Sequence, residues 1–176
     1  MNVAKFDTIA YLANGTSRQK QAYQLLTQHA VIKLLSSFSP ILTGTIPITI
    51  DIESSDLDII CEYADQKLFE KHIIQNFSNY DGFSLQCLTV NNIKSVLANF
   101  TIEGFPVEIF GQAVPVKQQM AYRHMIVEYK ILGQNEEAFR QKIIGLKKQG
   151  IKTEPAFAEA LNLSGDPYLA LLNFED

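Results

Sequence analysis

The hydrophobic pattern changes its period near Pro115, and this change limits the possible folds more than any other feature. Before Pro115, alternating apolar and polar residues predict strands over 41–43, 46–53, 56–62, 83–90, 96–102 and 105–110. Helical spacing predicts helices over 18–37 and 65–77, and then over 118–132, 136–148, 154–163 and 166–174. We therefore predict an α+β fold, with a mixed β-sheet core and flanking helices over 1–115 and a helical C-terminal region packed on it over 116–176.

Composition excludes several classes of protein. Hydrophobic residues make up 47% of the 176 residues, which is enough for a buried core. Fifteen Lys and Arg against 19 Asp and Glu leave a formal charge of −4, so no basic patch for DNA is evident. No apolar run reaches the roughly 18 residues of a membrane span, the first residues lack the layout of a secretory signal, and two cysteines cannot form a disulfide framework. We expect a cytoplasmic protein with no membrane partner.

Asp56 and Asp58 form the first candidate site, inside an apolar run. They are two residues apart on a predicted strand, so both side chains point to one face of the sheet. Two carboxylates so placed repel each other unless a proton or a cation intervenes. A hard divalent cation such as Mg²⁺ fits, because it takes oxygen ligands and shares its coordination shell with phosphate. A solvated sheet face, or acids beside a turn, would give the same pattern.

Two further features favour a metal site beside a phosphate. Gly44 and Thr45 follow a short apolar strand, where a glycine lets backbone amides approach an anion and a hydroxyl can bond a phosphate oxygen. Glu108 lies on a later predicted strand with apolar residues on both sides. An outward-facing acid on a half-buried strand is the structural alternative for Glu108.

Together these residues resemble the nucleotidyltransferase superfamily, which includes polymerase beta and kanamycin nucleotidyltransferase. The resemblance covers about residues 40–112 and is carried by Leu42-Thr43-Gly44-Thr45, Asp56-Leu57-Asp58 and Glu108. Nearly the full chain resembles an uncharacterised bacterial family within it, through 15–19, 44–47, 55–59 and 122–125 with Glu128. Thr45 stands in place of the usual Ser, and Ile46-Pro47 in place of the usual Arg-Gly.

The resemblance implies a nucleotidyltransferase-like sheet and transfer of a nucleoside monophosphate from a nucleoside triphosphate to an acceptor hydroxyl. Catalytic carboxylates that hold two Mg²⁺ ions would be Asp56, Asp58 and Glu108. Nucleotide-binding residues would be Gly44, Thr45, Ser55 and Arg123. The acceptor stays open between a small molecule, an RNA end and a protein side chain.

The predicted helix 118–132 carries a further candidate cluster. His124 and Glu128 are four residues apart and can face each other. They form a possible substrate clamp, with Arg123 on phosphate. A surface salt-bridge face around a satisfied core histidine explains the same residues without a ligand.

Two other functions fit the same sequence. One is a catalytically silent nucleotide- or protein-binding regulatory module, like the antitoxins of this superfamily, which the altered segment after Gly44 favours and the intact set of acids opposes. The other is metal-assisted phosphate hydrolysis. Release of pyrophosphate, of orthophosphate or of neither separates the three.

Overall fold

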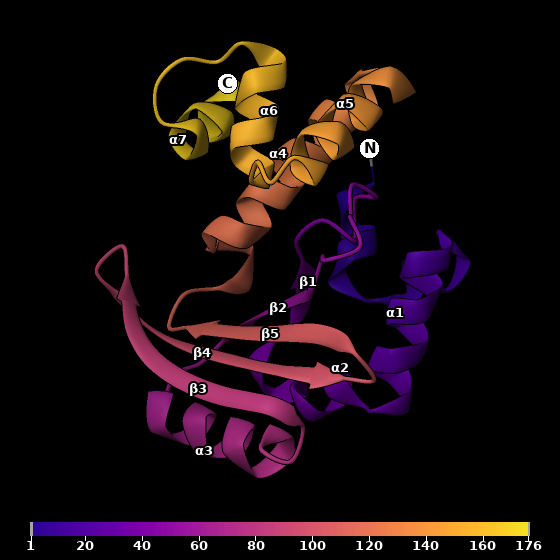
Figure 1. Ribbon diagram of the computed structural model, residues 1–176. Coiled ribbons are helices and arrows are strands. Elements are labelled where there is room, and N and C mark those ends of the chain that lie inside the picture. The colour runs from indigo at the N-terminus through magenta and orange to yellow at the C-terminus, as the bar shows by residue number, and fades with distance from the viewer. Residues whose placement is uncertain (1, 176) are drawn as a thin grey trace.

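One five-stranded sheet organises the computed structural model, which describes residues 2–175 (Figure 1). The strand order is β1-β2-β5-β4-β3, and only β2 and β5 run parallel to each other. The strands are β1 (Ile41–Thr43), β2 (Leu57–Glu62), β3 (Asp81–Val90), β4 (Ile93–Ile102) and β5 (Phe105–Gln112). The fold is therefore mixed α+β, as predicted.

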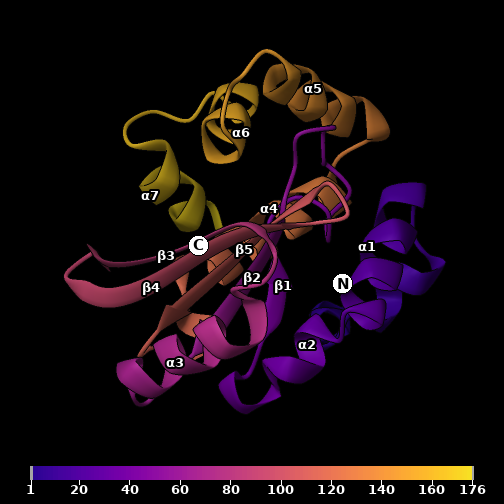
Figure 2. The ribbon, with the colours of Figure 1, turned by 60° about the horizontal axis from the view of Figure 1, so that its bottom comes forward.

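Helices cover both faces of this sheet (Figure 2). The first face packs against α1 (Ser17–Gln28), α2 (Val31–Leu34) and α3 (Gln66–Phe77). The second face packs against α4 (Met120–Gln134), α5 (Glu137–Lys148), α6 (Thr153–Leu161) and α7 (Pro167–Leu172). Short 3₁₀ helices are Val3–Asp7, Ala10–Asn14, Ser36–Phe38, Val116–Gln118 and Asn173–Glu175. No helix in this described part is long and apolar enough to cross a membrane.

The alternation of side chains along β2 separates two hydrophobic cores. Leu57 and Ile59 are buried in the core shared with α1, α2 and α3. Ile60 is buried in the core shared with the C-terminal helices. Since successive strand residues point to opposite faces, Asp58 lies on the same face as Ile60. The period-two pattern thus directs the strand carboxylates toward the C-terminal helices.

Gly111 on β5 allows α3 to pack closely on the sheet. A Cβ added to Gly111 would overlap the ring of Phe69, which is fully buried on α3 and packs against the rings of Phe38 and Tyr63. The ring is held on several sides, so it has no free space into which it can retreat. Glycine is therefore required here for packing.

We expect Gly111→Ala to lower the free energy of unfolding by about 2–3 kcal/mol, because overpacking forces the ring or the strand to shift. Urea denaturation followed by circular dichroism measures the change. Gly145→Ala is the matched control, since its Cβ meets no atom within 4 Å and alanine in a helix stabilises by up to about 1 kcal/mol. A Gly111→Ala variant as stable as the unmodified protein would contradict this packing.

Most predicted elements are confirmed, with boundary shifts of a few residues. The single helix predicted over 18–37 is wrong, because Ala30 adopts a left-handed conformation (φ 52°) that separates α1 from α2. Cys87 on β3 has an exposed thiol, which donates to Glu70 Oε1 at 3.2 Å.

The strand predicted over 46–53 is also wrong, because this segment is a loop between β1 and β2. Three of its isoleucines are buried, but in different cores: Ile46 lies with α1, whereas Ile48 and Ile50 lie with the C-terminal helices. Thr49 has a positive φ of 61°, which no regular strand contains. The alternating isoleucines of this segment therefore belong to a loop that contributes side chains to both hydrophobic cores.

Side chains of α1 hold this segment, residues 44–56, which we call the 44–56 loop. Arg18 Nη2 donates to the carbonyl oxygen of Ser55 at 3.1 Å. Gln19 Nε2 donates to the carbonyl oxygen of Ile46 at 2.8 Å. The loop lacks ladder hydrogen bonds, so these side chains satisfy backbone groups that a strand partner would otherwise satisfy.

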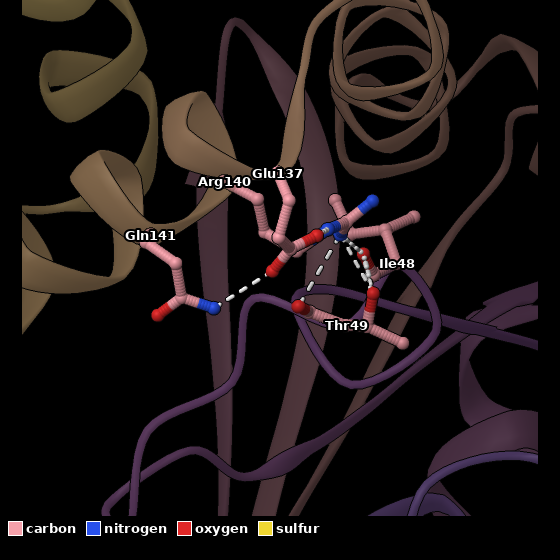
Figure 3. A network of polar contacts seen from close by, with 5 residues as sticks. All are labelled: Ile48, Thr49, Glu137, Arg140 and Gln141. Atoms are coloured by element: carbon pink, nitrogen blue, oxygen red, sulfur yellow. Dashed lines mark hydrogen bonds and ion pairs between the residues drawn. The ribbon is translucent and has the colours of Figure 1, made fainter.

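A side chain of α5 holds the same loop from the other side (Figure 3). Arg140 Nη1 donates to the carbonyl oxygen of Ile48 at 2.6 Å and to Thr49 Oγ1 at 2.6 Å. Glu137 Oε2 lies 3.2 Å from Arg140 Nε and orients the guanidinium. The loop is thereby anchored to two helices more than a hundred residues apart in sequence.

Candidate functional site

A cavity of about 620 Å³ lies between the second face of the sheet and the C-terminal helices. Strands β2 and β5 form one wall, which we call the sheet wall, and α4, α5 and α6 form the helix wall. The turn between β3 and β4 adds Val90, Asn91 and Ile93 at its rim. The ionisable residues that line the cavity are Asp56, Asp58, Glu108, His124, Glu128, Lys147 and Glu154.

The sheet wall brings together the three acids expected to act together. Asp58 on β2 and Glu108 on β5 are register partners on adjacent parallel strands. Asp56 lies two residues before Asp58, at the end of the 44–56 loop. All three line the cavity. Glu108 thus lies on the same face of the sheet as Asp58.

Burial and the neighbouring carboxylates make the ionised forms of Asp58 and Glu108 unfavourable. Burial raises the pKa of Asp58 to about 8, and the charges of Asp56 and Glu108 add to the shift while Lys147 opposes it. Burial and then Asp56 also raise the pKa of Glu108. Such coupled shifts are common at functional sites.

The donor chemistry of the sheet wall fits Mg²⁺, since it offers carboxylate oxygens from two neighbouring strands. As they lie, however, no three carboxylate, imidazole or thiol groups in residues 2–175 are close enough together to hold a metal ion. Like charges separate when no cation neutralises them. The three acids would therefore need to rotate toward one another to bind an ion together.

Gly44 begins the 44–56 loop with a positive φ of 77°, a conformation that glycine adopts without strain. A Cβ at this position would overlap Asp58 Oδ2. We expected a phosphate to approach the backbone at Gly44. In the structure the carboxylate of Asp58 occupies this space. Glycine at position 44 is needed for Asp58 to face the cavity.

The hydroxyls of Thr45 and Ser55 form a pair across the loop. Thr45 Oγ1 donates to Ser55 Oγ at 3.1 Å, and Ser55 Oγ also accepts from the backbone N–H of Ile52 at 2.9 Å. With both lone pairs of Ser55 in use, its own hydrogen is available to an acceptor. Both residues line the cavity, so Ser55 can donate to a bound anion while Thr45 orients it.

On the helix wall, His124 and Glu128 are both buried and both line the cavity. His124 Nε2 lies 3.1 Å from the carbonyl oxygen of Tyr168, and its Nδ1 lies 3.5 Å from Glu154 Oε1. A carbonyl oxygen only accepts, so Nε2 of His124 carries a hydrogen. Arg123 does not line the cavity; it is exposed, with Nη1 at 3.8 Å from Met120 Sδ.

Sequence reasoning missed Lys147 and Glu154. The side chain of Lys147 is buried in the cavity wall, and its Nζ donates to the carbonyl oxygen of Ile50 at 2.9 Å. One signal was available, because Lys147 follows buried Ile143 by four residues and so shares the apolar stripe of its helix. Glu154 carried no such signal, since an acid in the first turn of a helix is usual.

Solved structures with a similar fold include polymerases. The Cid1 poly(U) polymerase bound to MgGTP superposes with a TM-score of 0.54 at 12% identity, over 92% of this chain and 55% of that one. A GLD-2/RNP-8 complex gives 0.53 at 14%, over 87% and 61%, and the polymerase core of TRAMP, an RNA surveillance complex, gives 0.50 at 12%, over 93% and 50%. The chain therefore spans about half to three fifths of their length, and its fold is nucleotidyltransferase-like.

Sequence comparison places the chain in a family. Residues 24–174 match the family described as "Domain of unknown function (DUF4269)", and the chain belongs to it. No curated protein matches the chain by sequence.

Proposed function

We propose that this protein is a Mg²⁺-dependent nucleotidyltransferase that moves a nucleoside monophosphate from a nucleoside triphosphate to an acceptor hydroxyl. The observation that supports it best is the register pairing of Asp58 with Glu108, beside Asp56, on the wall of a cavity in a nucleotidyltransferase-like fold. These three carboxylates would hold two Mg²⁺ ions. When bound, such ions neutralise the triphosphate and lower the pKa of the attacking hydroxyl.

The reaction exchanges one phosphorus–oxygen bond for another. The acceptor oxygen bonds to the α-phosphorus, and the bond from the α-phosphorus to the bridging oxygen breaks. Pyrophosphate leaves with the bonding electron pair, and the hydroxyl proton passes to solvent. The protein has little covalent chemistry to perform, so its contribution is placement and charge compensation.

Side chains around the cavity supply that placement. Ser55 donates its free hydroxyl hydrogen to a phosphate oxygen, and Thr45 orients Ser55. Lys147 Nζ donates one of its three N–H groups to Ile50 O, and it would direct the other two toward the triphosphate. Arg123 would join only after its side chain moves from its present exposed position.

Lys147 gives a direct prediction. We expect Lys147→Met to weaken the binding of ATP with Mg²⁺ by at least about tenfold, because a charge-assisted hydrogen bond to phosphate is lost. Titration calorimetry measures the affinity. Lys148→Met is the matched control, since Lys148 is exposed on the same helix and lies outside the cavity wall. Equal affinities for the two variants would remove Lys147 from the nucleotide site.

The function itself is tested with the unmodified protein, Mg²⁺ and each of the four common ribonucleoside triphosphates. Calorimetry measures binding, and enzymatic assays measure pyrophosphate and orthophosphate released in the presence of a pooled metabolite extract. Pyrophosphate release supports nucleotidyl transfer, whereas orthophosphate release supports hydrolysis. Binding with neither product supports a silent nucleotide-binding module. No binding of any nucleotide would overturn the proposal.

A further inference from the structure

The two edge strands of the sheet differ in how well they are protected. Strand β1 is three residues long, and all three are buried. Strand β3 lies at the other end of the strand order and pairs with β4 (Figure 1). It is ten residues long, and its residues are exposed or half-buried throughout. Proteins usually shorten, cover or charge such an edge, because its backbone can pair with another chain.

The turn between β3 and β4 determines which backbone groups of β3 face outward. Both residues of this turn, 91–92, have positive φ, and the two residues that flank it are register partners. In such a two-residue hairpin the flanking pair is hydrogen-bonded, and hydrogen-bonded pairs then alternate along the ladder. The N–H and C=O groups of Leu85, Cys87 and Thr89 therefore point away from β4.

The sequence of this edge contains no charge. Between Asp81 and Lys94 there is no charged residue and no proline. A charged residue in the middle of an edge strand would lie close to its own copy in a symmetric pairing and repel it. The regular part of the ladder is 84–90, so an antiparallel pairing centred on Cys87 places only uncharged residues opposite one another.

Helix α3 adds an apolar side chain beside the same edge. Glu70 on α3 accepts from the thiol of Cys87 at 3.2 Å, so this side of the helix lies over β3. Ile74 is one turn further along that side of the helix, and 46% of it is exposed. A second copy placed at β3 would remove this apolar surface from water, which is favourable.

We propose that β3 pairs with β3 of a second copy of this chain, antiparallel and about a two-fold axis near Cys87, so that the two sheets become one. Two identical antiparallel strands complement each other, because outward N–H groups of each copy meet outward C=O groups of the other. Such an interface uses the same surface on both copies and is complete after two. Since the short edge strand β1 is buried, we expect a dimer and not a filament.

The pairing also concerns the rim of the cavity. Val90, at the end of β3, lines the cavity. In a pairing centred on Cys87, Val90 lies opposite Ser84 of the second copy. Each copy would therefore support the β3–β4 turn at the cavity rim of the other.

Sedimentation and cross-linking of the full chain test the pairing. Sedimentation velocity at about 1 to 500 µM should show a reversible monomer–dimer equilibrium with a micromolar dissociation constant, since one strand edge and one helix make a small interface. A short bismaleimide should cross-link the dimer through Cys87, whose thiol is exposed, whereas Cys61 is buried. Cys87→Ser should give no cross-link.

Variants assign the dimer to β3. Gln86→Lys puts a charge on the exposed middle of β3 and should weaken dimerisation by about tenfold or more. Gln75→Lys is the matched control, because Gln75 is exposed and, five residues after Glu70, lies on a different side of α3. Thr89→Pro removes an outward N–H, keeps the hydrogen bonds to β4 and should also weaken the dimer. Melting temperatures show that each variant folds.

Four results overturn the inference: a monomer at every concentration, a dimer that Gln86→Lys and Thr89→Pro leave unchanged, a dimer without a Cys87 cross-link, or growth beyond two copies. None of these measurements uses a nucleotide, so their outcome is independent of the proposed nucleotidyl transfer.

Discussion

Asp58→Asn is expected to lower Mg²⁺-dependent pyrophosphate release by at least about a thousandfold while the fold survives. Asp58 is the carboxylate on which the site converges, since it pairs in register with Glu108 and its Oδ2 lies against Gly44. An amide of the same shape keeps the packing but removes a charged oxygen ligand. Steady-state pyrophosphate assays at saturating Mg²⁺ measure the loss.

Glu62→Gln is the matched control for this experiment. Glu62 lies on the same strand and, by alternation, on the same face as Asp58, but outside the cavity wall. It should keep the rate of the unmodified protein. An Asp58→Asn variant with that same rate would exclude Asp58 from catalysis.

The second large effect concerns the stability of the metal-free protein. The pKa of Asp58 is raised to about 8 in the folded chain, against 3.8 for an ordinary aspartate. Between these two values the folded state holds a proton that the unfolded state has released, so stability falls as pH rises from about 4 to about 8. Below this window the group contributes no difference, and above it the full cost of the buried charge remains.

Asp58→Asn should remove this part of the pH dependence. We expect the variant to gain up to about 6 kcal/mol over the unmodified protein at pH 8.5 and almost nothing at pH 4. Urea unfolding at a series of pH values in the presence of a chelator measures both curves. Glu108 and Glu128 also have raised pKa values, so some decline with pH should persist. Parallel curves for the two proteins would show that Asp58 titrates normally.

Local patterns in the sequence predict much of this fold. The alternation of apolar residues correctly predicted β2 and β5. Each of these strands buries every second residue against α1–α3, which produces a regular period of two in the sequence. The 44–56 loop has the same alternation but no neighbouring strand; its carbonyls are bound by Gln19, Arg18 and Arg140 instead. The hydrophobic period shows which side chains are buried. It does not show whether the backbone carbonyls accept hydrogen bonds from a neighbouring strand or from side chains.

The sequence also predicts only part of the candidate site, namely the part that depends on local spacing. The two-residue spacing of Asp56 and Asp58 predicts that they share a face, and the structure has both in the cavity wall. The parallel pairing that sets Glu108 beside Asp58 comes from topology and is not contained in any local spacing. Lys147 and Glu154 reach the cavity because α5 and α6 pack over the sheet. Their role therefore depends on contacts between residues nearly a hundred positions apart, such as Lys147 and Ile50, which are 97 apart.

The anchoring of the 44–56 loop has a consequence for dissecting the molecule. The donors for the carbonyls of Ile48 and Ile50 come from Arg140 and Lys147 on α5. A fragment that ended at residue 115 would keep every sheet-wall carboxylate in its sequence, yet the segment bearing Ser55 and Asp56 would lose half of its tethers. The position of Ser55 and Asp56 therefore depends on hydrogen bonds from α5, in the last third of the chain.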